Sequence, residues 1–224
     1  MSLLAPREAY RLWAPTYEAG NALTELERGL VEKLGPSPEG RRLLDAGCGT
    51  GWRLRNAGAA RAVGVDLSPE MLAQGRGNSE LASVEFLEAD VCALPFQDAE
   101  FDLVWCRLVI GYVPDLGQAF RELARVTRAG GAVVVTDFHP EALATGLRRT
   151  FRHGDEEHEL LTYPHSVDAL ISAARSASLT FCRRADAHVG PQVRHFYVQA
   201  GREGFYLEHV GMPVVLGLSF VRDA

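Results

Sequence analysis

The chain has 224 residues, of which 47% are hydrophobic and 23% charged, and its formal net charge is −6. These values predict one globular α/β domain whose core folds without disulfide or metal staples. They argue against a nucleic-acid-binding surface, because phosphate binding depends on clustered lysine and arginine. Lys33 is the only lysine, which excludes lysine-dependent phosphate loops, Schiff-base enzymes and Tyr-x-x-x-Lys reductases. Small arginine groups at 148–152 and 183–184 are typical of solvated faces.

The four cysteines, Cys48, Cys92, Cys106 and Cys182, lie far apart and show no metal-ligand spacing. We therefore predict free, mostly buried thiols in a reducing compartment and no metal site. Residues 1–8 lack the basic-then-apolar pattern of a secretion signal, and no apolar run is long enough to span a bilayer. We expect a cytoplasmic protein with no membrane span.

The predicted elements begin with helices in residues 1–40, where Tyr10, Trp13 and Tyr17 form an aromatic cluster. Short apolar runs then alternate with amphipathic stretches, which predicts a parallel sheet covered by helices on both faces. The expected strands lie at 42–46, 62–66, 84–89, 101–106 and 132–138, and the expected helices at 51–59, 69–77 and 116–127.

The pattern loosens after His139 and regains order at a predicted helix over 166–177. Strand-like runs follow at 179–188 and 214–222, while 190–213, with four glycines and two prolines, is typical of a loop or lid. We therefore expect three parts of one domain. They are an N-terminal helical segment or lid at 1–40, a cofactor-binding α/β core at 41–138, and a C-terminal part at 139–224 with a substrate lid and the last strands.

The strongest motif is the glycine-rich turn that follows the first core strand, Asp45-Ala46-Gly47-Cys48-Gly49-Thr50-Gly51. Glycines suit a backbone that needs unusual dihedral angles and lets a ligand approach closely. A dinucleotide-binding turn has its third glycine at the sixth place, where this chain has Trp52. The spacing therefore fits a cofactor without a pyrophosphate.

This turn resembles the first motif of class I S-adenosylmethionine-dependent methyltransferases. Later segments are similar to further motifs of that class, in the same order. They lie at 63–72, 88–96, 101–106 and 128–132, and 94–96 with 123–126 resemble the small-molecule (methyltransferase type 11, ubiquinone/menaquinone-type) subgroup. The resemblance implies a doubly wound, mostly parallel seven-stranded sheet, Rossmann-like, with an N-terminal helical extension.

The resemblance also implies roles for residues at the strand ends. The backbone at Gly47, Gly49 and Gly51 would pass close to the methionine part of the cofactor, and Asp45 would hold nearby polar atoms. Asp66 would accept hydrogen bonds from both ribose hydroxyls, a task that suits a carboxylate because it offers only acceptors. The full implied set is Tyr17, Asp45, Gly47, Cys48, Gly49, Gly51, Asp66, Leu67, Met71, Asp90, Val91 and Cys106.

Within that set, Leu67 and Val91 would pack against adenine, and Asp90 would accept from its exocyclic amine. Cys106 would contact the methionine amine through its carbonyl, and Tyr17 would lie over the cofactor. Simpler interpretations stay open: Asp90 as a turn acid, Cys106 and Tyr17 as packing residues. An N-terminal cap at Ser68, before the helix that begins near residue 69, is compatible with ribose binding by Asp66.

The sulfonium of S-adenosylmethionine makes its methyl group electrophilic, so the protein supplies mainly alignment, and S-adenosylhomocysteine is the product. A base is needed only for an acceptor that arrives protonated. His139, after the fifth strand, is the one candidate base, although a role in capping the loop is an alternative. His158 and His165 flank the predicted lid and rank lower.

The acceptor is predicted to be a small molecule, because the segment after the fourth strand reads Cys106-Arg107-Leu108-Val109. It lacks the Asn/Asp-Pro-Pro-aromatic motif of DNA amino-methyltransferases and the paired glutamates of arginine methyltransferases. The nucleophile and the oligomeric state stay open. Two other classes also stay open, a nicotinamide oxidoreductase, which Trp52 opposes, and a non-catalytic S-adenosylmethionine-binding module.

Overall fold

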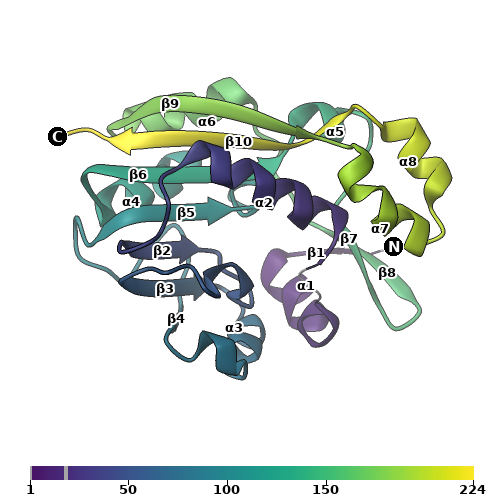
Figure 1. The fold of residues 1–224 in the computed structure, drawn as a ribbon, viewed down its shortest axis with the longest axis horizontal. Coiled ribbons are helices and arrows are strands. Elements are labelled where there is room, and N and C mark those ends of the chain that lie inside the picture. Colours follow the sequence, from purple (N-terminus) through teal and green to yellow (C-terminus); the bar gives the residue numbers. More distant parts are fainter. Residues whose placement is uncertain (1, 18–19) are drawn as a thin grey trace.

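A computed structural model describes residues 2–17 and 20–224 and contains a seven-stranded sheet in the order β4-β3-β2-β5-β6-β10-β9 (Figure 1). The first five strands in this order run parallel, and β10 is antiparallel to both of its neighbours. The predicted mostly parallel seven-stranded fold is confirmed. The strands are β4 (Glu85–Glu88), β3 (Arg61–Asp66), β2 (Arg42–Ala46), β5 (Phe101–Arg107), β6 (Thr127–Phe138), β10 (Pro213–Arg222) and β9 (Leu179–His188).

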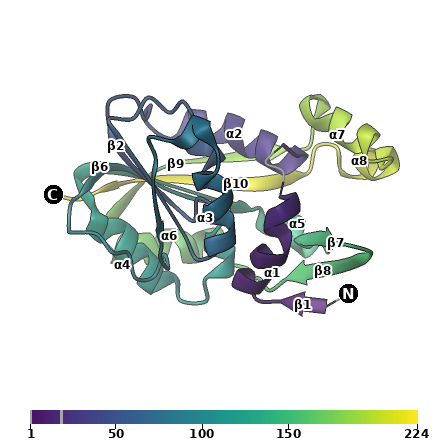
Figure 2. The same ribbon diagram turned by 90° about the horizontal axis from the view of Figure 1, so that it is seen from below.

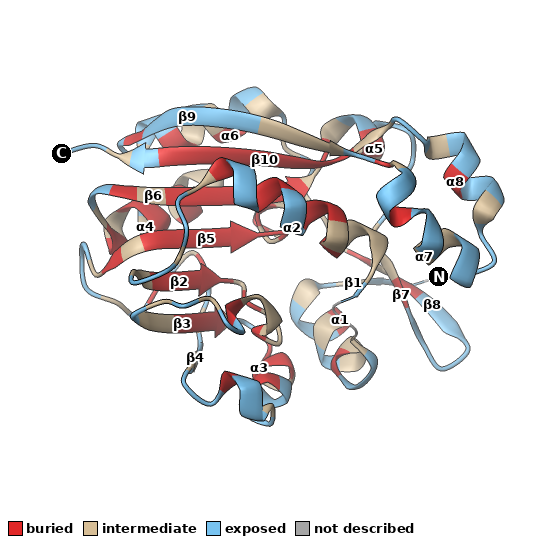
Figure 3. Ribbon diagram, viewed as in Figure 1, coloured by how far each residue is buried: buried red, intermediate tan, exposed pale blue. Residues whose placement is uncertain are grey.

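Helices cover both faces of this sheet, and the central strands are buried along most of their length (Figures 2 and 3). Helices α4 and α6 pack on one face with Phe120, Leu123 and Leu170, and α2 packs on the other. The helices are α1 (Pro6–Trp13), α2 (Ala22–Leu34), α3 (Pro69–Arg76), α4 (Leu116–Val126), α5 (Pro140–Ala144), α6 (Val167–Ser176), α7 (Arg194–Gln199) and α8 (Glu203–His209). None of the helices within the described ranges is long and apolar enough to cross a membrane.

Helix α2 is a layer of the core, although residues 1–40 were expected to form a helical segment or lid. Its N-terminus is fixed by a capping box, in which Asn21 accepts from the Thr24 amide at 3.0 Å. A Cβ atom added to Gly217 of β10 would lie 2.2 Å from Leu30 and 2.4 Å from Leu34. The glycine thus lets α2 approach the sheet closely.

A second, three-stranded sheet joins the N-terminus to the segment after α5. Strand β1 (Ser2–Leu4) runs parallel to β8 (Glu156–Leu160), which pairs antiparallel with β7 (Thr150–His153). Ala9 of α1 packs with buried Phe151 and Leu160. The region where the sequence pattern loosened is therefore an ordered hairpin, and it lies beside α1 (Figure 2).

The helix predicted over 51–59 is wrong. Only a single 3-10 turn forms, at Trp52–Leu54. Asn56 and Gly58 then take left-handed backbone angles, with φ of 56° and 67°, and such residues end a helix. Arg53 of this turn points inward and is buried, with 5% of its side chain exposed.

The segment 190–213, predicted as a loop or lid, contains the short helices α7 and α8. They pack against each other through Tyr197, whose ring centroid lies 6.0 Å from that of Phe205 and 5.7 Å from that of buried Tyr206. Two of the glycines that suggested a loop, Gly201 and Gly211, lie between and beyond the helices with positive φ, whereas Gly204 lies within α8.

Candidate functional site

A cavity of about 280 Å³ opens at the carboxyl ends of the parallel strands, where open α/β sheets place their ligands. Elements far apart in the sequence form its wall, including the turn after β2, the ends of β3 and β5, helix α1 and the segment before β7. Of the residues expected at the cofactor, the cavity is lined by Tyr17, Gly47, Gly49, Asp66, Leu67, Met71, Asp90 and Val91.

The backbone of the glycine turn shows why Gly47 and Gly51 are needed. Gly47 has a φ of +87°, and a Cβ atom there would lie 2.1 Å from the Val109 side chain. Gly51 has a φ of +71°, and its Cβ would lie 2.5 Å from the Phe86 ring. Gly47 therefore keeps the cavity wall open, whereas Gly51 lies outside the cavity lining and serves packing.

Asp66 ends β3 and is held by the backbone on two sides. Its Oδ2 accepts from the Gly49 amide at 2.8 Å and its Oδ1 from the Ser68 amide at 2.9 Å. Burial raises the pKa of Asp66, against the opposing effect of these amides. Ser68 caps α3 by accepting from the Met71 amide at 3.3 Å. The cap and a carboxylate aimed into the cavity thus coexist, as the sequence predicted.

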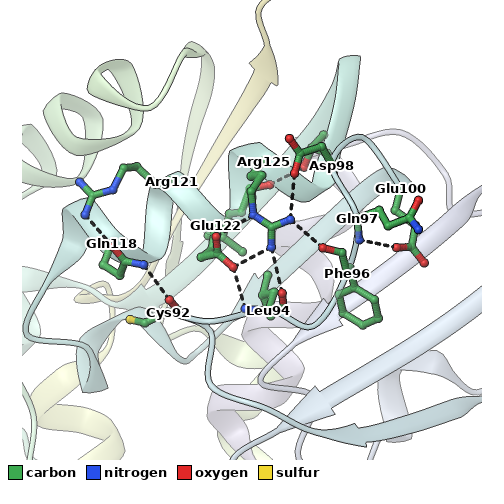
Figure 4. A network of polar contacts seen from close by, with 12 residues as sticks. Cys92, Leu94, Phe96, Gln97, Asp98, Glu100, Gln118, Arg121, Glu122 and Arg125 are labelled. Carbon is green, nitrogen blue, oxygen red and sulfur yellow. Dashed lines mark hydrogen bonds and ion pairs between the residues drawn. The ribbon is translucent and has the colours of Figure 1, made fainter.

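The loop that follows Asp90 is held by α4, as Figure 4 shows. Arg125 donates to the Leu94 carbonyl at 2.9 Å and to the Phe96 carbonyl at 2.6 Å, and Glu122 accepts from the Leu94 amide at 2.7 Å. These contacts connect the 94–96 and 123–126 segments that resembled one methyltransferase subgroup. Asp90 itself accepts from the Cys92 amide at 2.8 Å, so it is also a turn acid.

Asp45 and Arg53 form a pair of buried charged groups with unused hydrogen-bonding capacity. Within the described ranges, neither oxygen of Asp45 nor Nε of Arg53 has a hydrogen-bond partner. Burial raises the pKa of Asp45 to about 6. Arg53 lines the cavity, and buried polar groups without partners are rare in folded proteins. An acceptor and a donor left open beside the glycine turn fit the ammonium and carboxylate groups of an amino acid.

Glu27 of α2 was missed by the sequence analysis, although it organises this side of the cavity. It is fully buried and receives both Nε and Nη2 of Arg107 at 2.6 Å, with Arg53 Nε at 3.5 Å. Thr136 also donates to it, at 2.9 Å. The signal was present, because Glu27 lies on the apolar stripe that continues at 30, 31 and 34.

The far side of the cavity is lined by tyrosines and one more arginine. The hydroxyls of Tyr10 and Tyr112 lie 2.9 Å apart, and the Tyr17 ring packs edge-on against Tyr10. Arg149 lies 4.5 Å from the Tyr112 ring centroid. The 148–152 group was expected to be solvated. That expectation holds for Arg148 and Arg152, which are exposed, but is wrong for Arg149.

Four residues of the expected cofactor set, Asp45, Cys48, Gly51 and Cys106, do not line the cavity. Cys48 packs against Gly64, where an added Cβ would lie 2.7 Å from the sulfur. Cys106 belongs to the hydrophobic core, because β5 runs one residue further than predicted and brings Arg107 to the cavity instead.

The structure also places His139 outside the cavity lining. The residue is 2% exposed, and its Nδ1 accepts from the Glu141 amide at 3.2 Å as the cap of α5. Its Nε2 lies 3.1 Å from Arg184, and burial lowers its pKa. This geometry favours the capping role of His139, which was the alternative to a role as catalytic base. His158 and His165 also lie outside the lining, bonded to Ser2 and the Val113 carbonyl.

We therefore expect His139→Ala to leave cofactor affinity unchanged in calorimetry and to lower the free energy of unfolding by about 1 kcal/mol, through loss of the cap. His139→Asn, which keeps a capping acceptor, should recover most of that loss in urea unfolding. If His139→Ala has normal stability but loses turnover, His139 takes part in catalysis.

A parallel sheet with a glycine turn after one strand and an acid at the end of the next defines an α/β protein that binds a nucleoside cofactor. Residues 44–135 match the family model of a methyltransferase domain. This part of the chain is similar to that family, and the chain as a whole has the class I S-adenosylmethionine-dependent methyltransferase fold.

Individual relatives agree with this assignment. The malonyl-[acyl-carrier protein] O-methyltransferase of Enterobacter lignolyticus is 32% identical over 175 residues, which cover 76% of this chain and 65% of that protein. The protein of that name from Pseudescherichia vulneris is 39% identical, covering 61% and 55%. The chain thus spans less than two thirds of either relative. An S-adenosylmethionine-dependent methyltransferase structure from Mesorhizobium loti aligns with a TM-score of 0.68 and 22% identity, covering 91% of this chain and 99% of that one.

Proposed function

We propose that this protein binds S-adenosylmethionine and transfers its methyl group directly to a small-molecule acceptor. The observation that carries the proposal is the pairing of two features at the turn after β2. One is the glycine turn fastened to Asp66, with Gly49 bonded to its carboxylate. The other is the buried Asp45 and Arg53. Both oxygens of Asp45 and Nε of Arg53 lack a hydrogen-bond partner within the described ranges, although this Nε lies 3.5 Å from Glu27, and Arg53 lines the cavity. A nucleoside joined to an amino acid is the ligand class that would satisfy both.

The bound cofactor would supply an electrophilic methyl group, and the chain's own residues would bind, orient and exclude water. Asp66 would accept from the ribose hydroxyls with the lone pairs that the backbone amides leave free. Leu67, Val91 and Asp90, which line the cavity, would hold the adenine. Asp45 would receive the ammonium group and Arg53 the carboxylate of the methionine part.

The acceptor would enter from the side formed by α1 and the segment before β7. Tyr10, Tyr17 and Tyr112 line that side, and aromatic walls exclude water from the reacting groups. The relatives of E. lignolyticus and P. vulneris are O-methyltransferases by name, which supports an oxygen nucleophile. Alignment of nucleophile, methyl carbon and sulfur would be the protein's main contribution.

Calorimetry with S-adenosylhomocysteine and with NAD⁺ tests the proposal. We expect saturable binding of S-adenosylhomocysteine with one site per chain and no measurable binding of NAD⁺, for which the turn lacks the third fingerprint glycine. A protein that binds NAD⁺ and not S-adenosylhomocysteine would be an oxidoreductase. Tight S-adenosylhomocysteine binding without turnover across a broad metabolite screen would support the non-catalytic module.

The raised pKa of Asp45, about 6, leads to a pH dependence that can be measured. The carboxylate is ionised above that pH and protonated below it, so we expect affinity for S-adenosylhomocysteine to fall as the pH drops from 7 to 5. Asp45→Asn should bind more weakly at pH 7 and show a flatter profile. A wild-type profile that matches that of Asp45→Asn would argue against contact between Asp45 and the ammonium group.

The stability of the folded protein should depend on pH in the direction opposite to cofactor affinity. Because the pKa of Asp45 is higher in the folded protein than its ordinary value, the folded state binds more protons between about pH 4 and 6. The cofactor-free protein should therefore lose the contribution of Asp45 to stability as the pH rises through 6. Urea unfolding of Asp45→Asn should lack this loss, which separates the two effects.

A further inference from the structure

Arg149 is a cation in the cavity that no carboxylate of the described chain neutralises at ion-pair distance. Its Nη1 donates to the Leu108 carbonyl at 2.9 Å, and its guanidinium carbon lies 4.5 Å from the Tyr112 ring centroid and 4.9 Å from that of Phe138. A guanidinium has five N–H donors. The carbonyl and the two rings hold the group in place and leave most of its donors free.

The surrounding charges distinguish Arg149 from the other cavity arginines. Arg107 is bonded to Glu27 at 2.6 Å, and Arg53 lies 3.5 Å from the same carboxylate. Asp137, the acid that influences Arg149 most, already accepts from the Phe138 amide at 2.7 Å. Arg149 is therefore the arginine of the cavity lining that has no carboxylate at ion-pair distance within the described residues.

Phenol groups surround this charge and would act as donors. The hydroxyls of Tyr10 and Tyr112 lie 2.9 Å apart, so one donates to the other and the second has a proton to offer. Burial raises the pKa of Tyr17 to about 12 and that of Tyr112 well above its ordinary value. Both stay protonated near neutral pH. Two kinds of donor that converge on one space suit an oxyanion.

The position of this group relates it to the proposed methyl donor. Arg149 is bonded to Leu108, and the next residue, Val109, packs so closely on Gly47 that an added Cβ would lie 2.1 Å from its side chain. Gly47 is where the methionine part of the cofactor would pass. An anion held by Arg149 would therefore lie near the methyl group.

We propose that the acceptor is a carboxylic acid whose carboxylate is held by Arg149 and the Tyr10–Tyr112 pair and is itself methylated. This inference rests on the proposed function. A carboxylate oxygen forms the new C–O bond to the methyl carbon while the C–S bond breaks and leaves its electron pair on sulfur. The products are a methyl ester and S-adenosylhomocysteine, and the ionised acid needs no base. A single guanidinium charge matches one carboxylate better than a doubly charged phosphate monoester.

The first test measures recognition in the protein saturated with S-adenosylhomocysteine. Acetate, butyrate, hexanoate, benzoate, malonate and glutarate are titrated by calorimetry, each beside its neutral amide, with methyl phosphate as a second anion. At least one acid should bind about tenfold more tightly than its amide, which cannot pair with a charged guanidinium. Arg149→Met should weaken that acid about 30-fold and leave its amide unchanged.

Two control variants keep this test interpretable. Arg148→Met removes an exposed neighbour that lies outside the cavity and should change nothing. Arg149→Lys keeps the charge but loses the planar fork, so it should recover part of the affinity. In every variant S-adenosylhomocysteine affinity reports an intact fold and cofactor site. If that affinity is absent from the unaltered protein, the proposed function fails.

The second test identifies the bond that forms. The panel acids are incubated with S-adenosylmethionine labelled in its methyl group, and the product is treated with alkali. A methyl ester releases the label as volatile methanol, whereas an ether, amine or C-methyl product retains it. Alkali-stable label, equal binding of acids and amides, preference for methyl phosphate, or no binding of any panel acid beside normal S-adenosylhomocysteine affinity would each overturn carboxyl methylation.

Discussion

Replacement of Asp66 by alanine is expected to weaken S-adenosylhomocysteine binding about 100-fold in calorimetry. Two hydrogen bonds from the ribose hydroxyls to a buried carboxylate would be lost, and such bonds contribute about 1.5–3 kcal/mol each in favourable cases. The variant also frees the Gly49 amide, which donates to Asp66 at 2.8 Å, so the glycine turn loses its fastening as well.

A second variant separates these two effects. Asp66→Asn retains one acceptor oxygen and nearly the same shape, so it can keep the bond from the Gly49 amide that fastens the turn, and we expect it to lose affinity about tenfold. Asp186→Ala, at an acid outside the cavity lining, serves as the control and should bind normally. If Asp66→Ala binds S-adenosylhomocysteine as tightly as the control, the carboxylate does not hold the ribose.

The second large effect is expected at Glu27. Glu27→Gln should lower the free energy of unfolding by about 3–5 kcal/mol, because removal of one partner leaves buried charges uncompensated. Arg107 and Arg53 both face this carboxylate, at 2.6 and 3.5 Å. Urea unfolding followed by circular dichroism measures the difference.

Glu25 on the same helix provides a matched control, since its ion pair with Arg28 is solvent-exposed. Glu25→Gln should change stability by less than about 0.5 kcal/mol. Burial alone would raise the pKa of Glu27, but the two arginines and Thr136 lower it overall. The contribution of Glu27 to the free energy of unfolding is therefore present above the ordinary pKa of glutamate. It is lost as the pH falls through the lowered pKa of Glu27. Equal stability of the two variants would contradict this account of the network.

Much of the fold could be predicted because the deciding signals are local. Strand β2 begins and ends where the apolar run at 42–46 does, and α4 follows from apolar spacing and the Asp115 cap, which accepts from Gln118. The helix expected after Gly51 failed for a non-local reason. The turn ends early at left-handed Asn56 and sends Arg53 inward to Glu27, a partner 26 residues earlier in the chain.

The residues of the candidate site also divide into those that local sequence predicts and those that depend on distant contacts. Asp66, Gly47 and Asp90 lie in compact motifs at strand ends, so their place at the cavity followed from the sequence. Arg149 shares its local composition with exposed Arg148 and Arg152. It is distinguished only by the rings of Tyr112 and Phe138, which the tertiary fold brings to it. The acceptor side of the cavity is built almost entirely from such distant contacts.

The place of β10 in the sheet has a consequence for how the protein is made. This strand pairs with both β6 and β9, and its Gly217 receives Leu30 and Leu34 of α2. It is the last strand of the domain to emerge from the ribosome. Until it arrives, α2, with Glu27 on it, lacks the part of its packing surface that Gly217 provides. We therefore expect the nascent domain to remain open until β10 has been made, with its apolar faces available to chaperones, and to acquire its ligand-binding ability only after that point.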